Sequence, residues 1–149
     1  MNYMIYHWLF LISCLITPNP DSMQGTLTIT VENIQDAKGQ IRIGIFNKST
    51  GFPHDANVWR GLEFPVEAKG SMTIEIDDLP YGEYAIAAHH DLRKLGKMSK
   101  NMFGIPTEPY GFSNGAIAKW GDPQYSDAVF SFDQAGQAIQ IKIRPWSDY

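Results

Sequence analysis

Apolar and polar residues alternate along most of the chain. Residues 26–34 read TLTITVENI, with apolar side chains on one face of an extended segment and threonines on the other. Residues 40–46, 71–76 and 138–143 keep the same period of two. Because successive side chains of a β-strand point to opposite sides, this period predicts strands that bury one face.

Residues 84–88 (YAIAA) differ from the other predicted strands because both of their faces are apolar. Such a segment is typical of a strand covered on both sides, so we predict that it is the central strand. The motif LPYG just before it predicts a tight turn. Pro65 cannot donate a ladder hydrogen bond, which predicts an edge strand over residues 62–66. Residues 127–132 (DAVFSF) complete the set as a further strand.

About seven strands without a long helix predict an all-β fold, an antiparallel sandwich of two sheets. The chain has 149 residues, of which 44% are hydrophobic, so it can bury one core. We predict a single domain over residues 25–149. One long connection, residues 89–114 (HHDLRKLGKMSKNMFGIPTEPYGFSN), is expected to cap an end of the sandwich and to carry any function.

The charge of the chain argues against nucleic acid as a partner. The formal net charge is −4 at pH 7, and no Lys/Arg cluster stands out in the sequence. The single cysteine, Cys14, leaves the domain without a cysteine pair, so its stability must come from packing rather than from disulfides.

The first 24 residues form a leader in this interpretation. Residues 5–16 (IYHWLFLISCLI) are an uncharged apolar run that is too short to span a bilayer and has the length of a signal-peptide core. Cys14 ends the sequence LISC, which matches a bacterial lipoprotein box in which the cysteine is lipidated. Both interpretations, signal peptide and lipoprotein leader, predict export to the periplasm, the outer membrane or the extracellular space. Contact with a membrane is expected only through such a lipid anchor.

Four stretches together resemble a known family: GQIRIGIFN, DLPYGEYAIAAHHD, GIPTEPYGFSN and DAVFSFD. They are similar to the exported bacterial family named domain of unknown function 2141 (DUF2141), over residues 27–143. That family is uncharacterised, so the resemblance implies export and a fold but no reaction. The LPYGEY stretch is also similar to the corner of transthyretin-like sandwiches, which implies a prealbumin- or immunoglobulin-like topology.

The sequence HHD at residues 89–91 is the first candidate for chemistry. Consecutive residues of a strand point to opposite faces, so His89 and His90 cannot bind the same metal ion while the strand is regular. His89 and Asp91 share a face, but no second histidine cluster supplies a third ligand for zinc. We therefore expect one histidine to be a packed, hydrogen-bonded residue and Asp91 to tether the loop.

The resemblance also raises calcium, because relatives commonly carry an oxygen-rich DxNxNGxxD stretch after the HD pair. This chain keeps Asp91 and Gly96, but it has Arg93 and Leu95 at the intervening ligand positions and Ser99 where an acid is expected. A guanidinium and an isobutyl group cannot coordinate a dication. We expect no metal and no other cofactor.

Residues 104–114 (GIPTEPYGFSN) combine glycines, prolines and aromatic side chains. These residues suit a loop that folds back over the sandwich, and they also suit a surface that binds a peptide or glycan. The ligand-binding candidates of the loop are His89, His90, Asp91, Glu108, Tyr110, Phe112 and Asn114.

The sequence favours an exported cell-envelope module that is not an enzyme and binds an envelope protein, peptide or glycan through residues 89–114. No serine lies in a nucleophile-elbow context, and the acidic residues are scattered at turns. The alternative is a small hydrolase-like enzyme centred on His89, His90, Asp91 and Glu108. That alternative requires these side chains to converge in an open pocket.

Overall fold

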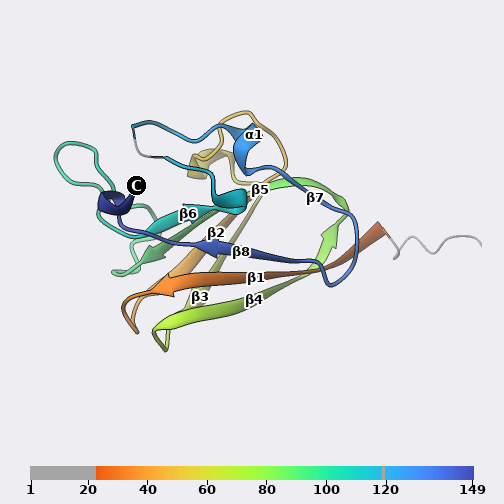
Figure 1. Cartoon of the computed structure of the whole chain (residues 1–149), viewed down its shortest axis with the longest axis horizontal. Coiled ribbons are helices and arrows are strands. Elements are labelled where there is room, and N and C mark those ends of the chain that lie inside the picture. The colour runs from red at the N-terminus through yellow and green to blue at the C-terminus, as the bar shows by residue number, and fades with distance from the viewer. Residues whose placement is uncertain (1–22, 119) are drawn as a thin grey trace, which may run out of the picture.

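A computed structural model of the chain describes residues 23–118 and 120–149 (Figure 1). The proposed leader with Cys14 lies outside the described residues, apart from its last two positions. Eight strands carry the described fold: β1 (Gln24–Ile34), β2 (Gln40–Phe46), β3 (Arg60–Pro65), β4 (Gly70–Pro80), β5 (Gly82–Asp91), β6 (Tyr110–Phe112), β7 (Phe130–Phe132) and β8 (Ala138–Lys142). The short helices are η2 (Asp55–Asn57), η3 (Ser113–Gly115), α1 (Tyr125–Ala128) and η4 (Trp146–Asp148).

The strands form two sheets, as the alternation predicts (Figure 1). One sheet has the order β4-β1-β8, and the other has the order β3-β2-β5-β6 with β7 also paired to β5. The β-sandwich prediction is confirmed, β5 is central, and β3 with Pro65 is an edge strand. One pair departs from the antiparallel pattern, because β8 runs parallel to β1.

The core lies between the two sheets and is built by the alternating apolar residues. Leu27, Ile29 and Val31 of β1 are fully buried, and Ile41 and Ile45 of β2 face them from the other sheet. Burying an aliphatic side chain of this size contributes roughly 1.5–3 kcal/mol relative to exposure. The same alternation turns the remaining side chains of β2 and β5 to the outer face of the larger sheet.

The chain changes sheets at the LPYGEY stretch, between β4 and β5. The hydroxyl of Tyr84 donates a hydrogen bond of 2.9 Å to the carbonyl of Pro80, four residues earlier. This contact resembles the tyrosine corner of immunoglobulin-like sandwiches, in which a tyrosine holds a crossing between sheets. Burial raises the pKa of the Tyr84 hydroxyl, so it remains a donor at neutral pH.

Two local expectations need correction. Residues 110–112 were expected to be loop, yet they form β6 and pair with β5, because the alternation of Tyr110 and Phe112 lets both rings pack on the sheet. Residues 127–132 were expected to be one strand, but α1 ends at Ala128 and only Phe130–Phe132 are extended. Ala128 is fully buried in a cluster of aromatic residues, and this packing outweighs the strand pattern.

No helix within residues 23–118 and 120–149 has the length and apolarity that crossing a membrane requires.

Candidate functional site

Strand register sets rows of side chains on the outer face of the larger sheet, the side turned away from β1, and three of these rows bear on the site. Glu63, Arg42, His89 and Tyr110 lie side by side across β3, β2, β5 and β6. The next row consists of Gly61, Gly44, Ala87 and Phe112, and the third pairs Phe46 with Ala85. A polar row therefore adjoins a row of small residues, and aromatic rings border the small residues.

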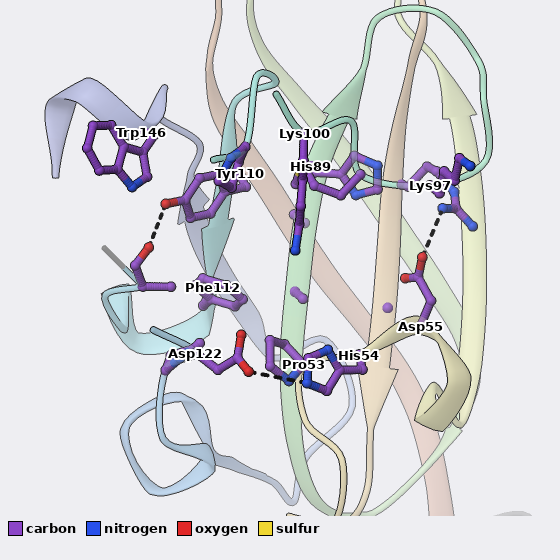
Figure 2. A pocket seen from close by; sticks show the side chains of 18 of the residues that line it. Pro53, His54, Asp55, His89, Lys97, Lys100, Tyr110, Phe112, Asp122 and Trp146 are labelled. Carbon is purple, nitrogen blue, oxygen red and sulfur yellow. Dashed lines mark hydrogen bonds and ion pairs between the residues drawn. The ribbon is translucent and has the colours of Figure 1, made fainter. Parts of the chain in front are cut away.

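The small residues form the floor of a cleft of about 940 Å³. Four segments wall it: the η2 region, residues 97–106, residues 118–123 without the undescribed position 119, and Trp146. Figure 2 shows Tyr110 and Phe112 on one side of this space and Pro53 with His54 at another. A volume of this size is typical of pockets that hold a small molecule or a short segment of a polymer.

Arg42 fixes one wall of the cleft. Its Nε donates to Glu63 at 2.9 Å, its Nη1 lies 3.7 Å from a carboxylate oxygen of Asp55, and it also donates to the carbonyl of Gly96. The guanidinium thus joins β3, η2 and the long loop. Since its Nε and Nη1 are engaged by these partners, Arg42 acts first as a brace of the wall.

An exposed ion pair links two walls. The Nε2 atom of His54 lies 3.2 Å from a carboxylate oxygen of Asp122 (Figure 2). Both side chains are about 60% exposed, so the pair contributes little to stability. It connects the η2 region to the segment that carries Trp120, whose side chain is 84% exposed.

Two lysines bring positive charge to the cleft. Lys97 and Lys100 line it, and Figure 2 shows the Lys100 side chain pointing into the space. Within the described part of the chain, no carboxylate lies within 4.0 Å of either ammonium group. The two acids of the lining, Asp55 and Asp122, are engaged with Arg42 and His54. The cleft therefore holds cations that its own acids leave unneutralised.

His89 lies in the polar row between Arg42 and Tyr110 and contributes to the lining. Its Nε2 atom is shielded from solvent and has no described protein group within hydrogen-bonding distance. Burial and the nearby Arg42 charge lower the pKa of His89, against smaller opposing effects of Glu108 and other acids. The imidazole is therefore neutral at pH 7. A buried nitrogen without a partner costs roughly 1–3 kcal/mol.

His90 and Asp91 have different surroundings, although they follow His89 directly. His90 is fully buried on the inner face, where its Nε2 lies 2.7 Å from the carbonyl oxygen of Lys38. Asp91 accepts hydrogen bonds from the amides of Leu95 and Gly96 at 2.9 and 2.8 Å. Neither residue lines the cleft.

The hydrogen bonds of Asp91 also set its charge state. Burial alone raises the pKa of this carboxyl, but the bonds from Leu95, Gly96 and Gln40 outweigh burial and hold the pKa below its ordinary value. Asp91 is thus an ionised carboxylate that tethers the long loop, as the sequence predicts.

Glu108 fastens the same loop from its other end. Its side chain is buried, and its two oxygens accept from the amides of Leu92 at 3.2 Å and Ser99 at 3.1 Å. A carboxylate committed to two backbone amides inside the loop is a structural brace. Glu108 does not line the cleft either.

The aromatic candidates of the loop belong to the cleft wall. Tyr110 and Phe112 are mostly buried, and the Tyr110 hydroxyl donates to the carbonyl of Ala118 at 2.6 Å. The ring of Tyr149 stacks on Tyr110 at 4.9 Å between centroids. Asn114 is exposed, adopts a left-handed backbone (φ 54°) and donates to the carbonyl of Val129 at 2.6 Å, away from the cleft.

The structure thus brings three of the seven predicted ligand-binding residues, His89, Tyr110 and Phe112, to one cleft. His90, Asp91, Glu108 and Asn114 are not part of its lining. Ligand binding by any of the seven stays a prediction. Within the described residues, no group of three or more His, Cys, Asp or Glu side chains is placed to hold a metal ion.

Sequence reasoning missed several lining residues: Arg42, His54, Asp55, Lys97, Lys100, Trp120, Asp122 and Trp146. One signal was present, because Arg42 and Gly44 occupy the polar phase of QIRIGIF and so had to face outward. The segments around His54 and Asp122 gave no such signal, since only the tertiary fold places them over the sheet.

Fold and site define the class of this protein: a two-sheet β-sandwich with a ligand-sized cleft on the outer face of one sheet. The sequence model of a bacterial family, described as an uncharacterised protein conserved in bacteria (DUF2141), matches residues 29–140. The chain belongs to this family, as its motifs predict. No curated protein and no solved structure matches it.

Proposed function

We propose that this protein is an exported, non-catalytic module of the bacterial cell envelope that binds an amphipathic small molecule in the cleft. The ligand would combine an aromatic or apolar body with an anionic group. Export rests on the apolar run at residues 5–16 and the alternative lipidation of Cys14.

The observation that carries the binding proposal is the composition of the cleft. Its floor is a row of small residues, its walls include the rings of Phe112 and Trp120, and the ammonium groups of Lys97 and Lys100 lack carboxylate partners among the described residues. Apolar walls with a few placed charges are the usual makeup of a small-molecule site. An anion contacting both lysines would complete the charge balance.

The hydrolase-like alternative draws no support from this arrangement. It requires His90, Asp91 and Glu108 to converge in an open pocket, whereas none of them lines the cleft. Asp91 and Glu108 are also occupied by backbone amides of the loop. Their geometry supports loop architecture rather than proton transfer.

The test uses 8-anilinonaphthalene-1-sulfonate, a fluorescent aromatic sulfonate with the proposed chemistry. We expect saturable binding of one equivalent to the folded protein, measured by fluorescence and calorimetry. Gly61→Leu fills the floor of the cleft; a Cβ atom at Gly61 meets only Val58, at an ordinary 3.6 Å, so the fold should persist. Binding should weaken at least about tenfold, because the new side chain clashes with the probe.

Gly82→Leu is the matched control, since Gly82 is also a strand glycine with only ordinary contacts, at 3.8 Å and beyond, and lies outside the cleft. Its affinity for the probe should equal that of the unmodified chain. Lys97→Gln with Lys100→Gln should also weaken the sulfonate probe. Equal affinity of Gly61→Leu and Gly82→Leu for the probe would contradict the proposal.

A further inference from the structure

The long connection contains a segment of one charge sign, which we term the cationic loop (residues 92–107). Four of the twelve Lys and Arg residues of the chain lie in it, and it contains no Asp or Glu. The whole chain carries a formal charge of −4, so the rest of the protein carries −8 against +4 on the loop. This separation gives the molecule a positive end that orients it toward an anionic surface.

Large apolar side chains lie exposed among these cations. Met102 is 91% exposed, Phe103 is 80% exposed and Leu95 is 51% exposed. All three belong to the cationic loop, and Met102 and Phe103 are adjacent in the chain. Their cationic neighbours are Arg93, Lys94, Lys97 and Lys100.

Hydrogen bonds shape the turn that carries Met102 and Phe103. The side-chain oxygen of Asn101 accepts from the amides of Phe103 at 2.9 Å and Ile105 at 3.0 Å, which forms a tight turn with Met102 and Phe103 at its tip. A bridge between Lys100 and Pro106 closes the base of this turn. The apolar tip is therefore held outward by its own backbone.

The loop also has a defined place in the molecule. In Figure 1 the turn projects from one end of the sandwich, beside the C-terminus, whereas the start of β1 lies at the opposite end. Asp91 and Glu108 brace its two ends through the bonds described above.

We propose that the cationic loop docks the protein on an anionic lipid bilayer, with Leu95, Met102 and Phe103 inserted at the level of the headgroups. Interfacial segments combine an apolar side with Lys and Arg, and each cation near an anionic membrane strengthens binding. A soluble polyanion would use the lysines but would leave the three apolar side chains in water. The bilayer accounts for both features.

Docking is independent of the small-molecule proposal, although Lys97, Lys100 and Phe103 belong to both surfaces. Docking places the cleft beside the membrane, and it adds a contact that a lipidated Cys14 does not supply. Gly61→Leu separates the two ideas, because it closes the cleft floor and leaves the cationic loop unchanged. This variant should dock like the unmodified chain even if its cleft binds nothing.

The experiment places an environment-sensitive NBD fluorophore at the tip, through Met102→Cys in the full chain with Cys14→Ser. We expect a blue shift and a rise in emission with vesicles of phosphatidylcholine and phosphatidylglycerol, and no change with phosphatidylcholine alone. The control carries the label through Gln134→Cys, an exposed turn residue at the opposite end, where Gly136 bonds to β1. Association through the first 24 residues would not move the tip label into the bilayer.

Neutralising the charge should weaken docking strongly. Lys94→Gln, Lys97→Gln and Lys100→Gln together should lower the partition coefficient roughly 100-fold, at about 1 kcal/mol for each cation near the surface. Adding Phe103→Ser to these substitutions should lower the partition coefficient further without changing the charge. Unchanged fluorescence of the label at position 102 with anionic vesicles would contradict the proposal. An equal fluorescence change with single-stranded DNA in the absence of lipid would also contradict it, and so would an equal change of the label at position 134.

Discussion

The two faces of the larger sheet are built by the same strands and have opposite properties. On the inner face Ile41, Ile43 and Ile86 are at most 2% exposed and pack against β1 and β8. On the outer face the residues between them are Arg42 and Ala87, and a cleft of about 940 Å³ lies over them. Alternation determines which face of the sheet is buried in the core. The loops that lie over the outer face determine whether that face forms a binding cleft.

The two adjacent histidines show the same contrast at the scale of one peptide bond. His90 points inward, is fully buried and contacts the carbonyl of Lys38. His89 points outward to the cleft, and its Nε2, like the Nδ1 of His90, has no described protein partner. A motif such as HHD therefore gives two side chains with separate tasks, because a regular strand sends them to opposite layers.

The largest predicted loss of stability comes from removing a side chain from the inner face. Ile86→Ala should lower the free energy of unfolding by about 3–4 kcal/mol, because Ile86 is fully buried in the central strand and leaves a cavity. Ala87→Gly, one residue along on the outer face, should cost at most about 1 kcal/mol. Urea denaturation of both variants checks the difference, and equal losses would contradict the assignment of the two faces.

The next effect concerns the brace of the cationic loop. Glu108→Gln should cost about 2 kcal/mol, since it removes the charge from hydrogen bonds to two backbone amides. Hydrogen exchange should show that the Leu92 and Ser99 amides lose protection while those of the inner strands keep it. Glu67→Gln is the matched exposed control and should stay within about 0.5 kcal/mol. Unchanged protection of the Leu92 and Ser99 amides in Glu108→Gln would contradict the brace.

The smallest effect is electrostatic and belongs to the outer face. The pKa of His89 is lowered below its ordinary value of 6.5, first by burial and then by Arg42. The unfolded chain therefore binds a proton more readily than the folded one. This contribution to stability is complete above pH 6.5 and is lost as the pH falls toward the lowered pKa.

An NMR titration of the imidazole protons tests this directly. Arg42→Met should raise the pKa of His89, because a neutral side chain replaces the neighbouring cation. His89→Gln should flatten the stability profile just below pH 6.5. A His89 pKa at or above 6.5 in the unmodified chain would show that burial and Arg42 do not act as described.

Much of the fold could be predicted from sequence because alternation is a local signal. It located the main strands, and the two apolar faces of residues 84–88 located the central β5. It failed at residues 127–132, where the burial of Ala128 among aromatic residues favours a helical turn, and at β6, whose three residues are too few to show a period. The parallel pairing of β8 with β1 is a long-range contact that no local pattern encodes.

The site was less predictable than the fold for the same physical reason. The HHD motif and the aromatic residues of the loop indicated part of the cleft lining, but the cleft is also lined by His54, Asp122 and Trp146 from distant segments. Net charge says little about single segments, because a chain total of −4 includes the four cations of the cationic loop. Charge has to be counted by segment before a partner is excluded.

The most direct test of the central claim is an amide NMR titration of the protein with 8-anilinonaphthalene-1-sulfonate. We predict that the largest shifts occur at Gly44, Gly61 and Ala87, the floor of the cleft, and that β4 of the smaller sheet stays unchanged. Shifts confined to β4, or no saturable change at these three amides, would contradict the claim that the outer face of the larger sheet is the binding site.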